Sequence, residues 1–192
     1  CLYPDFSSAF NTINVDKLML RLSNLYSNIS NWIYSFLSAR VQYTYIKNVN
    51  SYKQITNIGT PQGTVLSPIL FSIYTDFIRS SFSNTVIIKY ADDTVILGFI
   101  SNRRDSENYF SEVQSISQLC CDNDLILNAT KTHEMLFTSQ RQSPVITPMT
   151  VDNTAIAISS QVKYLCVLID NKLHFSEHIS KACEKASKKC MW

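Results

Sequence analysis

Two apolar runs, Val86–Ile88 and Thr94–Leu97, flank the polar turn Tyr90-Ala91-Asp92-Asp93. Such a pattern is typical of a β-hairpin, here with two carboxylates at its tip. Adjacent like charges at a tight turn repel each other, and a divalent cation such as Mg²⁺ would offset that repulsion. Taken alone, a solvated Asp-Asp turn is the simpler interpretation, because Asp is a common turn residue.

Further strand patterns lie on both sides of this hairpin. The runs Val41–Lys47 and Tyr52–Ile58 predict a second hairpin, joined by residues 48–51. Cys1–Phe6 is typical of the end of a buried strand. The remaining strands are expected at residues 134–138, at residues 162–169, and in a hairpin over 149–158 that turns at Asp152-Asn153.

Apolar residues at helical spacing predict five helices that pack on these strands. Asn14 is expected to cap the first, and the second is expected to start near Ser30. In the third, Ser67 is the predicted cap and Pro68 the first helical residue. Its inward residues are expected to be Ile69, Leu70, Ile73 and Phe77. The fourth helix is predicted over Asp105–Asp122, and Ser176 is the predicted cap of the last.

The composition is that of a globular protein, with 45% apolar and 17% charged residues among 192. A formal net charge of +2 does not indicate a class of partner. The lysines near the C-terminus form a basic helix face, which more often serves solubility than phosphate binding. The six cysteines show no metal-ligand spacing, so we expect reduced, mostly buried thiols of an intracellular protein in the nucleus or cytoplasm. The sequence contains no signal peptide and no apolar run that could span a bilayer.

Three other segments carry candidate chemistry. Asp5 follows a predicted strand, at the position where such folds present catalytic groups, although it could equally cap the next segment. Gly59-Thr60-Pro61-Gln62-Gly63 holds two of the three glycines of the chain. A loop of this kind allows the backbone to approach a ligand closely, and it is also a common generic turn. Lys131 precedes a predicted strand, where a solvated lysine is more common than a catalytic one.

Six motifs follow one another along the chain: Asp5–Ile13, Phe36–Gln42, Gly59–Gly63 with Leu66-Ser67-Pro68, Tyr90–Asp93, Leu125–Asn128 with Lys131-Thr132, and Lys163-Tyr164-Leu165 with Ile169-Asp170. Each is weak alone. The ordered set resembles the reverse transcriptase domain of non-LTR (LINE-type) retrotransposons, and it covers most of the chain.

The resemblance implies a set of site residues. Asp5, Asp92 and Asp93 match the carboxylates that hold two Mg²⁺ ions (or Mn²⁺ in their place) for nucleotidyl transfer. Lys131 matches a lysine that protonates the pyrophosphate leaving group. The nucleotide site would be formed by Phe6, Phe10, Gln62 and Gly63, with the Phe10 ring excluding a 2′-hydroxyl and so selecting deoxynucleotides.

The resemblance also implies an α+β fold: a polymerase palm in which an antiparallel sheet carries helices on one face. Residues 1–170 would form the palm, with a fingers-side insertion at about 30–60, and residues 171–192 the start of a thumb or connection helix. The implied function is RNA-directed DNA synthesis from deoxynucleoside triphosphates on a template RNA and a DNA primer. An RNA-dependent RNA polymerase is disfavoured because Phe10 would block ribose.

Several departures favour a different interpretation, a catalytically inactive remnant that at most binds nucleic acid. Pro4 stands where the family carries an apolar residue, Cys166 stands where it carries a primer-grip glycine, and Leu119 stands where a tryptophan is expected. The chain opens on Cys1 in mid-strand, so we expect a fragment without the first fingers strands that is inactive on its own.

Overall fold

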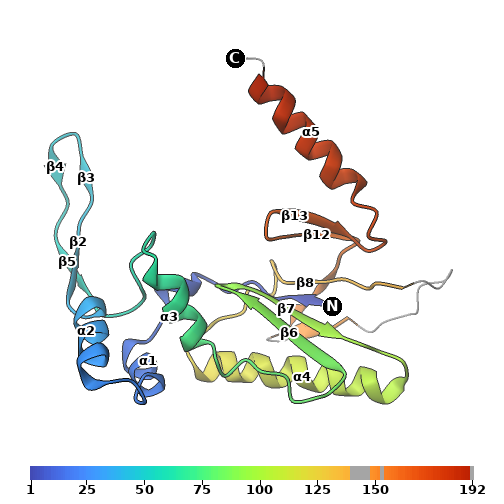
Figure 1. Ribbon diagram of the computed structural model, residues 1–192, viewed down its shortest axis with the longest axis horizontal. Coiled ribbons are helices and arrows are strands. Elements are labelled where there is room, and N and C mark those ends of the chain that lie inside the picture. The colour runs from blue at the N-terminus through green and yellow to red at the C-terminus, as the bar shows by residue number, and fades with distance from the viewer. Residues whose placement is uncertain (139–147, 152–153, 191–192) are drawn as a thin grey trace.

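A mixed sheet of five strands is the centre of the computed structural model, which describes residues 1–138, 148–151 and 154–190 (Figure 1). The strand order is β11-β8-β1-β7-β6. All neighbours pair antiparallel except β11 and β8, which are parallel. The strands are β1 (Leu2–Tyr3), β6 (Thr85–Tyr90), β7 (Asp93–Gly98), β8 (His133–Glu134) and β11 (Ala157–Ile158).

Five α-helices occur in the described part of the chain: α1 (Val15–Arg21), α2 (Ser27–Leu37), α3 (Leu66–Tyr74), α4 (Arg103–Asp122) and α5 (Ser176–Cys190). The Asn14 side chain accepts the Lys17 N–H and caps α1 as predicted. None of the helices in the described ranges is long and apolar enough to cross a membrane.

The two faces of the sheet pack into different clusters. Leu2 and Ile96 belong to the main core, together with Tyr109, Val113 and Ile116 of α4. On the other face, Tyr3, Val95 and Met135 pack with Val162 and Tyr164. Helix α4 therefore covers the first face, and the second face lies against the later hairpin that contains Val162 and Tyr164.

The second predicted hairpin is present and extends away from the sheet (Figure 1). It consists of β2 (Arg40–Gln42), β3 (Tyr45–Ile46), β4 (Val49–Asn50) and β5 (Gln54–Thr56), with β2 paired to β5 and β3 to β4. We call residues 40–56 the arm. The predicted turn at 48–51 is wrong: the chain turns at Lys47-Asn48, where φ is 46° and 67°. Positive φ at both residues gives a two-residue turn that matches the strand twist.

The C-terminal third differs most from the predictions. Residues 162–169 form not one strand but a hairpin of β12 (Gln161–Tyr164) and β13 (Val167–Asp170). The strand predicted at 134–138 is limited to β8. The hairpin over 149–158 is present as β9 (Thr150–Val151) and β10 (Thr154–Ala155), while its turn lies outside the described residues.

Several helix predictions also need correction. Helix α2 begins at Ser27, and α3 begins at Leu66 without a side-chain cap. Ser67 instead donates its hydroxyl hydrogen to the Pro61 carbonyl at 2.6 Å, and Ile69 is exposed rather than inward. Helix α5 begins at Ser176 itself. The cysteines are not mostly buried: Cys120 is buried, Cys1 is half-buried, and Cys121, Cys166 and Cys183 are exposed free thiols.

Candidate active site

The two central carboxylates lie at the tip of a regular hairpin. Strands β6 and β7 pair from Thr85↔Gly98 to Tyr90↔Asp93, and Ala91-Asp92 form the turn. This confirms the predicted hairpin. Ala91 has φ 53°, a left-handed conformation that costs an L-residue roughly 1–2 kcal/mol. Strain of this kind is frequently found at functional sites.

Asp5 is held by a segment more than a hundred residues away. Its N–H donates to the Thr132 hydroxyl at 3.1 Å, and its carbonyl accepts the Asn128 N–H at 2.7 Å. The next residues continue this contact, since Phe6 pairs with Leu127. The Lys131 N–H donates to the Asn128 carbonyl at 3.1 Å, which makes Lys131 part of the turn that holds Asp5.

The glycine loop packs directly against the segment after Asp5. The Gly59 N–H donates to the Ile13 carbonyl and the Thr60 N–H to the Phe10 carbonyl, both at 2.7 Å. A Cβ on Gly59 would lie 2.8 Å from the Asn11 Cα and the Phe10 oxygen, and φ there is 73°. The close backbone approach expected of this glycine therefore exists, but its partner is the protein's own chain.

The electrostatic coupling among the three aspartates centres on Asp93. Its pKa is raised, first by partial burial and then by the negative charges of Asp92 and Asp5. Asp5 follows β1, and β1 pairs with β7, which starts at Asp93. The fold thus brings these carboxylates near one another from two neighbouring strands.

A tyrosine from the later hairpin lies near Asp93. Burial and then the Asp93 charge raise the pKa of Tyr164. The Tyr164 hydroxyl is buried and has no hydrogen-bond partner among the described residues. Its ring is 5.8 Å from that of Tyr3, on the same sheet face as Val95. Side-chain alternation along β7 places Asp93 on that face too, because it lies two residues before Val95.

The predicted nucleotide-binding residues differ in accessibility. The Phe6 side chain is 8% exposed in the core, 6.3 Å from the ring of Phe71, so only its main chain can reach a nucleotide. Phe10 is half-buried and 5.2 Å from the same ring. Gln62 is exposed and donates to the Asn11 side chain at 3.3 Å. Gly63, with φ 79°, faces open space.

The donor chemistry fits a hard divalent cation, because three carboxylates with coupled charges supply the oxygen ligands that Mg²⁺ takes. The arrangement of these ligands is less complete than their chemistry. Within the described ranges, no group of three or more His, Cys, Asp or Glu residues is arranged to hold a metal ion. The carboxylates are neighbours without forming a finished coordination shell.

Comparison with known proteins defines the family. The sequence profile described as reverse transcriptase (RNA-dependent DNA polymerase) matches residues 1–169. The chain belongs to the reverse transcriptase family. This confirms the family expected from the ordered motifs.

Three relatives of this chain are named as polymerases of transposable elements. It is 24% identical, over its whole length, to 22% of the probable RNA-directed DNA polymerase from transposon BS of Drosophila melanogaster. It is 25% identical to the RNA-directed DNA polymerase from mobile element jockey of the same organism, over 93% of the chain and 20% of that protein. The match to the probable polymerase from transposon X-element is 23% identical, with the same coverage. The chain thus spans about a fifth of the length of these curated relatives, whose names agree with the expected non-LTR type.

Sequence reasoning missed the residues that position the site. Asn128 and Thr132 hold the Asp5 backbone, and Tyr164 lies near Asp93. All three lie within the motifs that carry the family resemblance, but the resemblance assigned them no role. The signal available was their place in those motifs, because sequence spacing alone does not show which distant segments pair.

Proposed function

We propose that this domain carries the catalytic centre of an RNA-directed DNA polymerase, which transfers deoxynucleotides to a primer 3′ end. The supporting observation is the electrostatic coupling of Asp5, Asp92 and Asp93 from two paired strands of the sheet. The sheet with helices on one face would be the palm, over residues 1–170. Segment 30–60 would be its fingers-side part, and residues 171–192 would begin the thumb.

Asp5, Asp92 and Asp93 would hold the two Mg²⁺ ions, for which Mn²⁺ could substitute. When bound, such ions stabilise the attacking and leaving oxygens of an in-line displacement. The protein's own contribution is to fix the carboxylates. Asp5 is fixed by main-chain bonds to Asn128 and Thr132, and Asp93 by its place in the ladder with Tyr90.

The remaining site residues would position the nucleotide. Phe10 is fixed by its contact with Phe71 and by the bond from Thr60, so its ring can act as a wall against a ribose 2′-hydroxyl. Gln62 and Gly63 would line the nucleotide and template side, and Phe6 would contribute its main chain. Lys131 would donate a proton to the pyrophosphate leaving group, which is a general-acid role.

Primer extension on an RNA template, with the full-length polymerase that contains these residues, tests the proposal. Asp92→Asn should remove nearly all DNA synthesis, whereas Asp16→Asn, an exposed position on α1, should leave it intact. Primer–template binding should persist in both variants. Synthesis that survives in Asp92→Asn would show that the chemistry takes place elsewhere.

A second function, nucleic-acid binding without catalysis, is favoured by one observation. No ready three-ligand metal group exists among the described residues. The two functions differ in their response to Mg²⁺, because a catalytic centre must bind it. Mg²⁺ should raise the melting temperature of the parent chain and not that of Asp92→Asn. An equal response in both would favour the binding-only function.

A further inference from the structure

The arm contributes nothing to either core cluster. Every residue from 41 to 55 is exposed. Tyr52 is 96% exposed and Tyr43 is 54% exposed, and no arm residue belongs to the packed clusters. Contiguous exposed apolar and aromatic surface of this kind marks an interaction site.

The charge around the arm has one sign. Between Asp16 and Asp76 the sequence contains no Asp and no Glu, but it contains five Lys and Arg residues. The rest of the chain has an excess of acidic residues. Lys47 at the turn and Lys53, just before β5, make no side-chain ion pair or hydrogen bond among the described residues. A polyanion is thus the partner that this segment attracts.

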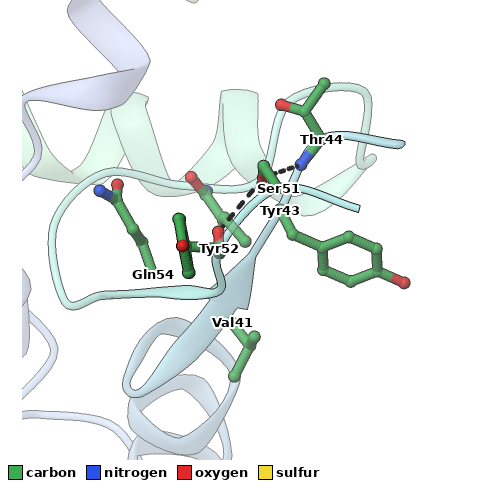
Figure 2. A pocket seen from close by; sticks show the side chains of 7 residues that line it. Val41, Tyr43, Thr44, Ser51, Tyr52 and Gln54 are labelled. Atoms are coloured by element: carbon green, nitrogen blue, oxygen red, sulfur yellow. Dashed lines mark hydrogen bonds between the residues drawn. The ribbon is translucent and has the colours of Figure 1, made fainter. Parts of the chain in front are cut away.

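Between the pairs β2–β5 and β3–β4, the arm borders an open pocket with a volume of about 740 Å³ (Figure 2). There the Ser51 N–H donates to the Thr44 carbonyl at 2.9 Å, while the Thr44 N–H donates to the Ser51 hydroxyl at 2.8 Å and not to a backbone carbonyl. The lining residues include Tyr43, Tyr52, Gln42 and Gln54, and none of them is charged. Aromatic faces beside amide donors and acceptors suit a base, which stacks on rings and hydrogen-bonds at its edge.

Arg40 joins the arm to the candidate active site. Its guanidinium donates to the carbonyls of Leu37, Ile58 and Gly59, the last at 2.8 Å. Gly59 in turn bonds to Ile13, near the end of the Asp5 motif. Arg40 thereby fixes the base of the arm to the glycine loop, and Lys47 and Lys53 are left as the phosphate contacts.

We infer that the arm binds single-stranded nucleic acid, with unpaired bases on Tyr43 and Tyr52 and the phosphate backbone near Lys47 and Lys53. A duplex is disfavoured because its bases are already stacked and cannot enter the pocket at the arm. Binding at the arm does not require the carboxylates, so it holds whether or not the domain is catalytic.

Fluorescence anisotropy of the purified chain with a labelled RNA of about 16 nucleotides tests this inference, without Mg²⁺ or nucleotides. Replacing both tyrosines, Tyr43→Ala with Tyr52→Ala, should weaken single-strand binding roughly tenfold or more for each ring. Tyr43→Phe with Tyr52→Phe should retain most of the affinity, because the rings remain. Phe99→Ala, at a 61% exposed ring outside the arm, is the matched control and should change nothing.

Replacing Lys47 and Lys53 should change the salt dependence of RNA binding. Lys47→Gln with Lys53→Gln should flatten the salt dependence by about 0.7 in the log–log slope for each phosphate that is no longer neutralised. Unchanged single-strand affinity in the double alanine variant would overturn the inference. So would an equal decrease of affinity for the same RNA annealed to its complement. Self-association that disappears with the tyrosines, while RNA affinity stays constant, would identify a second copy as the occupant and would also overturn it.

Discussion

Two hairpins of this domain have similar sequence patterns and opposite surroundings. Strands β6 and β7 carry Val95 and Ile96, which are 4% and 1% exposed, whereas the arm carries Val41 and Ile55 at 55% and 71%. The difference comes from distant elements. Strand β1 pairs with β7 on one side, and α4 packs beneath it, while the arm has no such neighbour. The fold therefore fixes the hairpin with the carboxylates and leaves the arm open to a ligand.

The largest expected difference in stability is between two isoleucines, one in each hairpin. Ile96→Ala should lower the free energy of unfolding by about 2–5 kcal/mol, because it opens a cavity in the core. Ile55→Ala should cost less than about 1 kcal/mol, since that side chain is exposed. Urea unfolding of both variants measures the difference. A similar decrease in both would mean that the arm is packed in solution.

Replacing Pro4, which lies beside the carboxylate hairpin, should change the free energy of unfolding by a smaller amount. Cys1 exchanges backbone hydrogen bonds with Met135, on the side of β8. Because backbone groups alternate in direction along a strand, those of residues 2 and 4 are directed toward β7. Continuing the Leu2↔Ile96 register places Pro4 opposite Thr94, where proline has no N–H to donate. Pro4→Leu should raise the free energy of unfolding by on the order of 1 kcal/mol.

Pro4→Ala separates the hydrogen bond from the added volume of leucine at this buried position. It restores the N–H with a small side chain. Thermal melting of both variants is the measurement. Midpoints at or below that of the parent in both would show that Pro4 is harmless.

The turns of the two hairpins differ in strain. Ala91→Gly should stabilise the domain by about 1 kcal/mol, because glycine adopts a positive φ without the cost that alanine has. Asn48→Gly in the arm should gain less, since asparagine tolerates the left-handed region. Chemical denaturation compares the two. An equal gain at both turns would argue against special strain beside Asp92.

The smallest expected effect is the pH dependence that Asp93 gives to the free energy of unfolding. Because its pKa in the folded protein lies above the ordinary 3.8, the folded state binds the proton more tightly than the unfolded state. The contribution of the protonated Asp93 carboxyl to stability is complete below pH 3.8, and it is lost as the pH rises through the raised pKa of the folded state. Asp93→Asn should therefore stabilise the chain at neutral pH by a few tenths of a kcal/mol without divalent ions. A destabilised variant at pH 7 would contradict the coupling.

The sequence allowed the local features to be predicted. Two apolar runs on either side of a polar turn predicted the β6–β7 hairpin, and Asn14 predicted the start of α1. It did not show that Asn128 and Thr132 hold Asp5, because hydrogen bonds between distant segments leave no periodic signal. The turn at Leu165-Cys166 was missed for another reason. Both residues have positive φ without being Gly, Asn or Asp, the usual turn signal.

The central claim is that chemistry and strand binding reside in different hairpins. It is tested most directly by measuring nucleotide addition and RNA affinity together in two variants of the full-length polymerase. We predict that Asp92→Asn abolishes addition while leaving RNA affinity unchanged. The double variant Tyr43→Ala with Tyr52→Ala should lose RNA affinity but keep the rate of addition at saturating RNA. If either variant lost both properties while remaining folded, the separation of roles would be contradicted.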